Sequence, residues 1–297
     1  MDNHNIYDRI PGVFSSCMKI IFLRRSGVQP GSELPRIKVS IDNVTIDENH
    51  LKEYMELCGL RNDGTLPILY PHVFTAPLQM AVVSHKNFPV SCLGILHYRN
   101  HIISHRAINA DEKLSIKIEL VESRIVKQGA EFDYTIQVRS EGEMVWESIT
   151  TYLKKGKFRA EYHPSPNGNL IQAEPEMERY AEFFIPGDIG NRYARICSDY
   201  NPIHLSKTVA RLFGYKKKVA HAMWAAACSI GRLPGINLDN PVRVDLAFKG
   251  PLFTGSKSYI TAFDGGDYSR FDYYCGDNPR AVINGKISAV EKGYRLI

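Results

Sequence analysis

Two patterns of apolar residues occur along this chain: short runs with a period of two, and longer unbroken segments. In residues 131–140, EFDYTIQVRS, every second residue from Phe132 to Val138 is apolar. That period is typical of a strand with one buried face. Further strands are predicted at 114–122 and 144–153 in the first half of the chain, and at 242–248, 258–263, 270–275 and 281–290 in the second.

The long apolar segments lie at 66–84 and 219–231, each before one group of strands. The second segment, VAHAMWAAACSIG, is apolar almost all round and has Gly231 and Pro234 near its end, which predicts a buried helix. A buried helix followed by antiparallel strands indicates a sheet wrapped around that helix. Because this order occurs twice, we expect a duplicated α+β domain with two such sheets side by side.

A polar segment rich in Pro, Gly and charge lies at 154–178, which is typical of a linker. It divides the chain into a first unit at 1–153 and a second unit at 179–297. The two units resemble each other in the order of their elements and only faintly in their residues.

Composition narrows the class of protein. The 297 residues are 44% hydrophobic and 23% charged, as in ordinary globular domains. The formal net charge of +5 suits an anionic ligand and is too small to indicate nucleic acid. The 6 cysteines have no CxxC spacing, so we expect neither disulfides nor a thiolate metal site. We find no signal-peptide pattern and no run long enough to span a bilayer, and we therefore expect a cytoplasmic protein.

Candidate chemistry gathers in the stretch ICSDYNPIHLS at 196–206. Asp199 and His204 flank an Asn-Pro turn, and Pro202 fixes φ, so the two side chains keep their relative position. A carboxylate and an imidazole held in one loop can share one water and transfer its protons. Asn-Pro turns are also common without any chemistry, so this stretch alone does not distinguish a turn from a site.

The residues around the stretch extend the pattern. Tyr193-Ala194 precedes it, and Ala210, Gly214 and the triplet at 221–223 follow it. At these spacings, residues 190–230 resemble the MaoC-like (R)-specific enoyl-CoA hydratases and dehydratases, which have the hotdog fold. The resemblance implies a double hotdog with a silent first unit and a catalytic second unit. It implies Asp199 and His204 as catalytic residues, the backbone N–H of Ala222 as oxyanion donor, and a supporting motif of Tyr193, Asn201, Pro202, His221 and Met223.

Two positions depart from the family pattern. Ser198 and Ala222 stand where the family has glycine. Glycine reaches backbone conformations that serine avoids, so Ser198 puts the shape of the loop in doubt. Ala222 keeps its N–H and adds a methyl group near a bound thioester. Because φ is negative at a helix N-terminus, we expect alanine to be tolerated there.

Two features near the motif have both a functional and an ordinary interpretation. Lys216, Lys217 and Lys218 can contact the phosphates of coenzyme A, or they can form a solvated charge run. Cys197 lies beside the motif with no second base for it, and we expect a small buried residue rather than a nucleophile.

We therefore predict a hydro-lyase that adds water reversibly to trans-2-enoyl-CoA, giving (R)-3-hydroxyacyl-CoA, with no metal or redox cofactor. The family's silent first unit can leave room for a longer acyl chain. In that unit, Arg99, His101 and His105 form a cationic cluster that either ligand binding or one polar strand face explains.

Two alternatives stay open. One is a 3-hydroxyacyl-[acyl carrier protein] dehydratase, because the positive net charge suits an acidic carrier protein as well as coenzyme A. The other is a non-catalytic protein that binds acyl thioesters or acts as a scaffold. The sequence leaves the acyl chain length, the direction of the reaction and the formation of a homodimer open.

Overall fold

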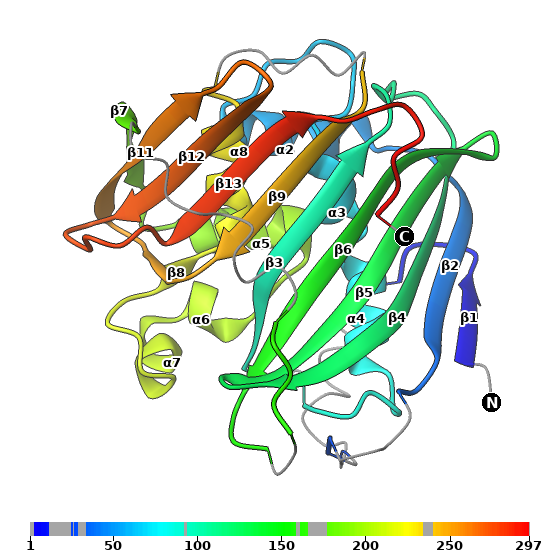
Figure 1. Ribbon diagram of the computed structural model, residues 1–297, viewed down its shortest axis with the longest axis horizontal. Helices are drawn as coiled ribbons and strands as arrows, with labels where there is room; N and C mark the ends of the chain where they lie inside the picture. Colours follow the sequence, from blue (N-terminus) through cyan, green and yellow to red (C-terminus); the bar gives the residue numbers. More distant parts are fainter. Residues whose placement is uncertain are drawn as a thin grey trace.

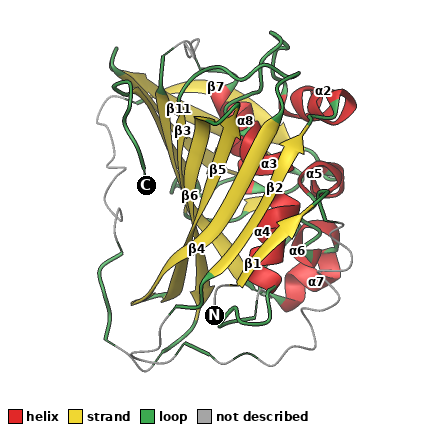
Figure 2. Ribbon diagram, turned by 90° about the vertical axis from the view of Figure 1, so that its right-hand side faces the viewer, coloured by secondary structure: helices red, strands yellow, loops and turns green. Residues whose placement is uncertain are grey.

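One large sheet runs through both halves of the chain, with the helices on one of its faces (Figures 1 and 2). The computed structural model describes residues 3–11, 25, 27–28, 34–91, 94–158, 161–165, 177–233 and 240–296. Within these residues the 11 strands have the order β1-β2-β4-β5-β6-β3-β9-β13-β12-β11-β7. Their bounds are Asn3–Tyr7 (β1), Ile37–Val44 (β2), Leu114–Val126 (β4), Gly129–Ser140 (β5), Glu143–Lys155 (β6), Ile95–Ser104 (β3), Val242–Phe248 (β9), Ile283–Ala289 (β13), Tyr268–Cys275 (β12), Ser256–Asp264 (β11) and Glu178–Ile185 (β7).

The period of two in 131–140 is confirmed as a strand. Phe132, Ile136 and Val138 of β5 are fully buried, and Tyr134 is 1% exposed. These side chains share one face of the strand, because successive residues point to opposite sides. That face packs towards the helices, so the alternation in the sequence marks the core of the first half.

Each half has a buried helix against its own strands, as predicted. In the first half, the segment at 66–84 forms two consecutive helices, α3 (Tyr70–Phe74) and α4 (Ala76–Ser84). The chain is divided there because Pro77 has no N–H to continue the helix and is suited to the first turn of a new one. In the second half, α8 spans Ala222–Ile230, and every residue from Met223 onwards is buried.

The two sheets that the sequence predicts are joined edge to edge. Strand β3 of the first half pairs antiparallel with β9 of the second, from Arg99 opposite Ala247 to Ser104 opposite Val242. Each half thereby covers a strand edge that would otherwise expose unpaired backbone groups. The result is one continuous sheet (Figure 1).

Four further helices lie on the same side of the sheet as the central ones (Figure 2). Helix α2 spans Glu48–Cys58. It begins after Asp47, whose carboxylate accepts from the N–H groups of Asn49 and His50, and it ends at Gly59, which has the left-handed conformation. The others follow one another in the second half: α5 (Ile189–Cys197), α6 (Pro202–Leu205) and α7 (Lys207–Leu212). Strands β8 (Val219–Ala220) and β10 (Leu252–Phe253) form a separate small sheet.

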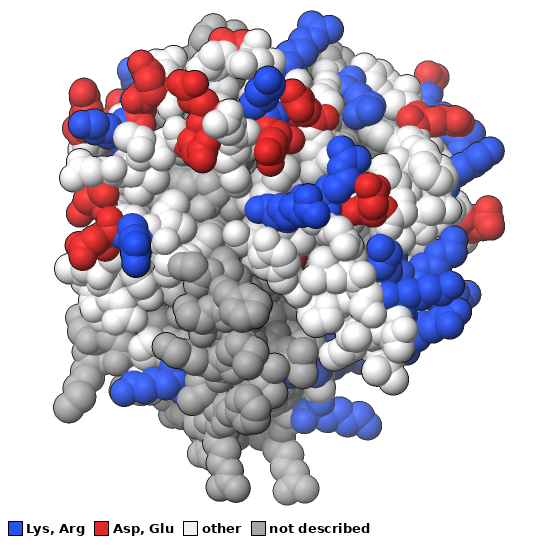
Figure 3. Space-filling view, turned by 180° about the vertical axis from the view of Figure 1, so that it is seen from behind, with Lys and Arg blue, Asp and Glu red and all other residues white. Residues whose placement is uncertain are grey.

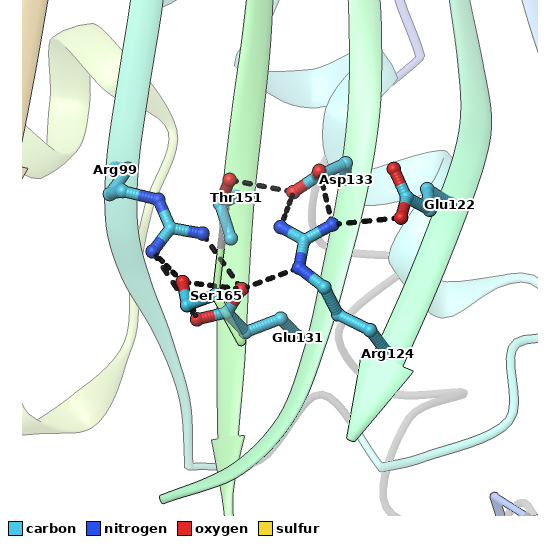
Figure 4. Close-up of polar contacts among 7 residues, drawn as sticks. All are labelled: Arg99, Glu122, Arg124, Glu131, Asp133, Thr151 and Ser165. Carbon is cyan, nitrogen blue, oxygen red and sulfur yellow. Dashed lines mark hydrogen bonds and ion pairs between the residues drawn. The ribbon is translucent and has the colours of Figure 1, made fainter. Parts of the chain in front are cut away.

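Ion pairs on the opposite face of the sheet explain the cationic cluster of the first half (Figure 4). Arg99 pairs with the fully buried Glu131 at 2.7 Å, and Glu131 also accepts from Arg124. His101 lies 2.6 Å from Asp245, and His105 lies 3.1 Å from Glu147. Each cation of the cluster therefore has a carboxylate partner, which favours the polar strand face over ligand binding.

Only part of the expected linker belongs to the described residues. Strand β6 ends at Lys155 and β7 begins at Glu178. Between them, residues 161–165 lie against the outer face, where Ser165 donates to Glu131 (Figure 4). The division into units at 1–153 and 179–297 stays a prediction.

Candidate active site

The loop between α5 and α6 carries Asp199. It leaves α5 through Ser198, whose φ of 56° and ψ of 15° lie in the left-handed region. Asp199 Oδ1 then accepts from the N–H of Asn201 at 3.0 Å, and Asn201 Oδ1 caps α6. Pro202 starts α6 and His204 follows two residues later, so the predicted Asn-Pro turn also holds both side chains in place.

Helix α5 packs directly under the backbone of His204. A Cβ atom on Gly190 would lie 2.1 Å from the carbonyl oxygen of His204, so only glycine fits at this crossing. The sequence gives no indication of this role for Gly190, because no periodicity or turn signal marks a glycine that makes room for another helix. Its role depends on a contact across the fold.

The carbonyl oxygen of Val219 determines the tautomer of His204. His204 Nδ1 lies 2.6 Å from that oxygen, and a carbonyl can only accept, so Nδ1 carries the proton. The lone pair of Nε2 is then free, and Nε2 lies 3.6 Å from Asp199 Oδ2. This separation is too long for a direct hydrogen bond and leaves both atoms as acceptors for a shared donor. The Asp199 side chain is 41% exposed, so solvent reaches the pair.

His221 lies on the other side of His204. The two rings stack with centroids 3.7 Å apart, and His221 Nε2 donates to the backbone oxygen of Asp199 at 3.0 Å. Burial, and the repulsion that a second proton on the stacked imidazole pair would meet, lower the pKa of His221 to about 3, so this ring is neutral at ordinary pH. His221 thereby supports both His204 and the Asp199 backbone.

The electrostatics of Asp199 favour its charged form. Partial burial by itself raises the pKa of this carboxyl group, but His204, His221 and the N–H of Asn201 outweigh it and lower the pKa well below its ordinary value. Asp199 is therefore a carboxylate, and hence an acceptor, at ordinary pH.

Ala222 is the first residue of α8, directly after His221. Its φ is negative, as expected, so alanine fits this backbone without strain. Its N–H belongs to the first turn and has no acceptor within the helix. Ala222 is partly exposed, whereas the rest of α8 is buried. The helix therefore presents a free donor where its positive dipole end is accessible.

The supporting residues are buried around this centre. Tyr193 is 1% exposed, and its ring centroid lies 5.2 Å from that of His221. Met223 is 6% exposed and belongs to the core. Cys197 is buried, and burial together with the charge of Asp199 raises the pKa of its thiol, which agrees with a packing role rather than a nucleophile.

The three lysines lie in the connection between α7 and β8. Lys216 and Lys217 are exposed, and Lys218 is half-buried with its carbonyl oxygen bonded to the N–H of Thr254. The face that carries the helices shows Lys and Arg side chains gathered along one side (Figure 3). Their contact with coenzyme A stays a prediction.

One side chain of the first half supports the site through hydrogen bonds that no pattern in the sequence indicated. His50 of α2 lies 2.7 Å from the hydroxyl of Tyr70 and 2.8 Å from the carbonyl oxygen of Ile196 in α5. Because that carbonyl only accepts, His50 donates to it from Nε2 and accepts from Tyr70 at Nδ1. The first half thus anchors the helix that leads to Asp199.

Asp199, His204 and His221 each offer one ligand atom, and these atoms lie within 4.8 Å of one another. Such a group can bind a cation when its lone pairs converge. Here Nε2 of His221 is committed to the carbonyl oxygen of Asp199. The His221 ring would have to turn before it faced a cation.

Comparison with known proteins identifies the second half. Residues 169–271 match the profile of the MaoC like domain. The second half of the chain is therefore similar to that domain. It is 27% identical over 238 residues to 3-hydroxyacyl-thioester dehydratase X of Mycobacterium tuberculosis, a similarity that spans 79% of this chain and 83% of that protein. The predicted MaoC-like relationship and a hydro-lyase of the dehydratase class are thereby confirmed.

Solved structures agree on the fold of the chain. The crystal structure of HtdX from Mycobacterium tuberculosis has a TM-score of 0.72 at 23% identity, covering 85% of this chain and all of that chain (100%). A conserved hypothetical protein of the same organism, described as a double hotdog, has a TM-score of 0.56 at 12% identity, covering 91% and 97%. The predicted double-hotdog fold is confirmed. No helix in the described part of the chain is long and apolar enough to cross a membrane.

Proposed function

We propose that this MaoC-like protein hydrates trans-2-enoyl-CoA reversibly to (R)-3-hydroxyacyl-CoA through Asp199 and His204. The observation that carries the proposal is the pair of free acceptors, Asp199 Oδ2 and His204 Nε2, 3.6 Å apart at a solvent-accessible position. One water can donate one hydrogen to each of them.

The chemistry follows from the protonation of the two groups. The water oxygen bonds to C3 of the enoyl group as His204 Nε2 takes one of its protons. Asp199, held as a carboxylate, accepts a hydrogen bond from the second hydrogen, which stays on the oxygen and becomes the hydrogen of the 3-hydroxyl group, and it stabilises the imidazolium that forms. The electron pair of the double bond moves to the thioester oxygen, and Nε2 then delivers its proton to C2. The same steps in reverse dehydrate the 3-hydroxyacyl thioester.

The enolate oxygen needs a donor, and the N–H of Ala222 is suited to that role. Such a donor typically stabilises a transition state by about 3 kcal/mol. Lys216 and Lys217 are suited to the phosphates of coenzyme A, because they are exposed in the connection that leads to His221. All the groups that these steps need come from the protein, and we expect the reaction to need no metal.

The test is the loss of enoyl-thioester absorbance with crotonyl-CoA, followed by chiral analysis of the product. Asp199→Asn and His204→Ala should each lower the rate by about 10² or more with the fold retained, which is the usual contribution of a general acid–base group. Wild-type turnover in either variant would exclude the dyad. Treatment with a chelator should leave the rate unchanged, and loss of activity that one added metal restores would overturn the metal-free mechanism.

One observation supports the alternative in which the substrate is carried by acyl carrier protein. Leu212 is 81% exposed and Phe213 is 44% exposed, close in sequence to Lys216 and Lys217. A protein partner can cover apolar side chains that coenzyme A leaves in water. Comparing crotonyl-CoA with the crotonyl carrier protein in wild type and in Leu212→Ser decides between the two. A loss in the variant that is confined to the carrier protein favours the dehydratase of acyl carrier protein.

A further inference from the structure

Helix α2 of the first half is hydrogen-bonded to two helices of the second half, α5 and α8, which lie on the same side of the sheet (Figure 2). Near the start of α2, His50 Nε2 donates to the carbonyl oxygen of Ile196, in the last turn of α5, at 2.8 Å. Near its end, the carbonyl oxygen of Leu57 accepts from Trp224 Nε1 of α8 at 3.0 Å. One helix of the first half thus joins the element that leads into the catalytic loop to the element that carries the oxyanion donor.

Helix α5 ends without the backbone hydrogen bond that closes α2. At the end of α2, the N–H of Gly59 donates to the carbonyl oxygen of Glu56 at 3.3 Å. Ser198 has the same left-handed conformation at the end of α5, but within the described residues no backbone N–H donates to the carbonyl oxygen of Ile196. A carbonyl group in the last turn of a helix then needs a donor from outside the helix, and a histidine side chain is suited to that role. His50 therefore supplies the hydrogen bond that this turn lacks.

Two histidines from different halves of the chain hold the backbone of this turn at both ends. His50 donates to the carbonyl oxygen of Ile196, and His221 Nε2 donates to the carbonyl oxygen of Asp199 at 3.0 Å. The Asp199 side chain leaves the backbone between these two anchors. A shift of either anchor therefore changes the separation of 3.6 Å between Asp199 Oδ2 and His204 Nε2.

The position of His50 is determined by the core of the first half. The hydroxyl of Tyr70 donates to His50 Nδ1 at 2.7 Å, so the proton of the neutral ring lies on Nε2, where it faces α5. Tyr70 is 1% exposed, and its ring centroid lies 5.1 Å from that of Tyr54 in α2. The backbone N–H of His50 donates to Asp47 at 3.2 Å. Both ring nitrogens and the backbone of His50 are therefore held.

We propose that His50 is a positioning residue, which sets the place of Asp199 relative to His204. It acts through the carbonyl oxygen of Ile196 and not on the substrate. The proposal rests on the proposed function, and it gives the first half a part in the reaction although the catalytic motif lies in the second half. Loss of His50 should lower kcat and leave KM near its wild-type value, because the alignment of the two acceptors matters for the reaction of the bound thioester.

The experiment measures kcat and KM with crotonyl-CoA for wild type, His50→Ala, His50→Gln and Tyr70→Phe. His50→Ala should lower kcat by about tenfold, because a misplacement of about 1 Å can cost a factor of about 10² and the anchor at His221 remains. His50→Gln should keep kcat within about threefold of wild type, because its amide N–H can donate to the same carbonyl oxygen. Tyr70→Phe removes the hydroxyl that fixes the tautomer, and its kcat should lie between those of wild type and His50→Ala.

Tyr273→Phe is the matched control for Tyr70→Phe. Tyr273 of β12 is fully buried, and its hydroxyl also has a hydrogen bond of 2.7 Å, to Ser258 Oγ. The two changes remove the same group from similar surroundings, so urea unfolding should show a similar loss of stability in both variants. Only Tyr70→Phe should lower kcat, because Ser258 lies in β11 and not in the catalytic loop.

Wild-type kcat in His50→Ala overturns the proposal, and so does a loss in Tyr273→Phe as large as that in Tyr70→Phe. If His50→Ala does not fold, His50→Leu replaces it, because leucine keeps most of the side-chain volume and has no donor.

Hydrogen exchange separates the positioning role from the proposed function. If no thioester turns over in wild type, the proposed function fails, but the anchor can still be measured at the amide of Asn201, which donates to Asp199 Oδ1. This amide should exchange about tenfold faster in His50→Ala than in wild type, because loss of the anchor favours local opening of the turn, and Tyr273→Phe should leave its rate unchanged. Exchange at the wild-type rate in His50→Ala overturns the positioning role whatever the activity.

Discussion

Replacement of Gly190 by alanine should separate the position of His204 from its chemistry, because the change leaves every polar group of the site intact. The added Cβ would lie 2.1 Å from the carbonyl oxygen of His204, whereas ordinary contact begins near 3.4 Å. Helix α5 or the His204 backbone must therefore move by about 1.3 Å. A misplacement of about 1 Å at a catalytic group can cost a factor of about 10² in rate. Overpacking of this kind also typically costs about 1–3 kcal/mol of stability.

The assay measures kcat with crotonyl-CoA and the free energy of unfolding in urea for wild type, Gly190→Ala and a control. Gly187→Ala is the matched control: a Cβ at this position would meet nothing within 4 Å, and the backbone there is not left-handed. We expect kcat to fall about a hundredfold in Gly190→Ala and to stay near wild type in Gly187→Ala. Wild-type kcat in Gly190→Ala, or an equal loss in both variants, would refute the idea that this close approach positions His204.

Three further changes test other parts of the structure. Ser198→Gly should stabilise the protein by about 0.5–1 kcal/mol in urea unfolding, because glycine adopts the left-handed conformation without strain and this gain exceeds the cost of a more flexible unfolded chain. Ser269→Gly is the control: Ser269 lies in the extended strand β12, so glycine there should destabilise the protein. His221→Gln should make the free energy of unfolding fall less steeply as the pH is lowered. With the pKa of His221 lowered to about 3 in the native state, the unfolded chain binds a proton below about pH 6.5 that the native ring does not bind. The native state therefore loses roughly 2 kcal/mol from this group between pH 6.5 and 5, and an equal pH dependence in the variant would contradict this assignment. Asp133→Ala should cost about 3 kcal/mol in urea unfolding because it removes a carboxylate from the buried Arg124, whereas Glu122→Ala, which removes an exposed partner of the same arginine, should cost less than about 1 kcal/mol (Figure 4).

Local spacing accounts for the parts of the site that could be read from the sequence. Asp199 and His204 are five residues apart around a proline, and the backbone of so short a loop leaves them few relative positions. The same holds for the apolar run that becomes α8. These features depend on residues close in the chain, and their predictions needed no tertiary contact.

The buried face of a strand could be predicted from the sequence, but the neighbour of a strand in the sheet could not. Alternation in 131–140 marks which face of β5 is buried, because the period of two is a property of the strand itself. The partner of β3 is not such a property. Its pairing with β9 depends on two edges, about 140 residues apart, being complementary, and this pairing converts two predicted sheets into one.

The sequence by itself thus determined the central apolar segment of each half, the strands that follow it, and the residues that a short turn brings together. Only the tertiary structure decided that Gly190 must lack a side chain and that His50 ties α5 to Tyr70 of α3. Each of these depends on atoms from distant segments meeting at van der Waals or hydrogen-bond distance. Periodicity and turn chemistry describe one segment at a time, whereas the contacts between segments come from how the whole core packs.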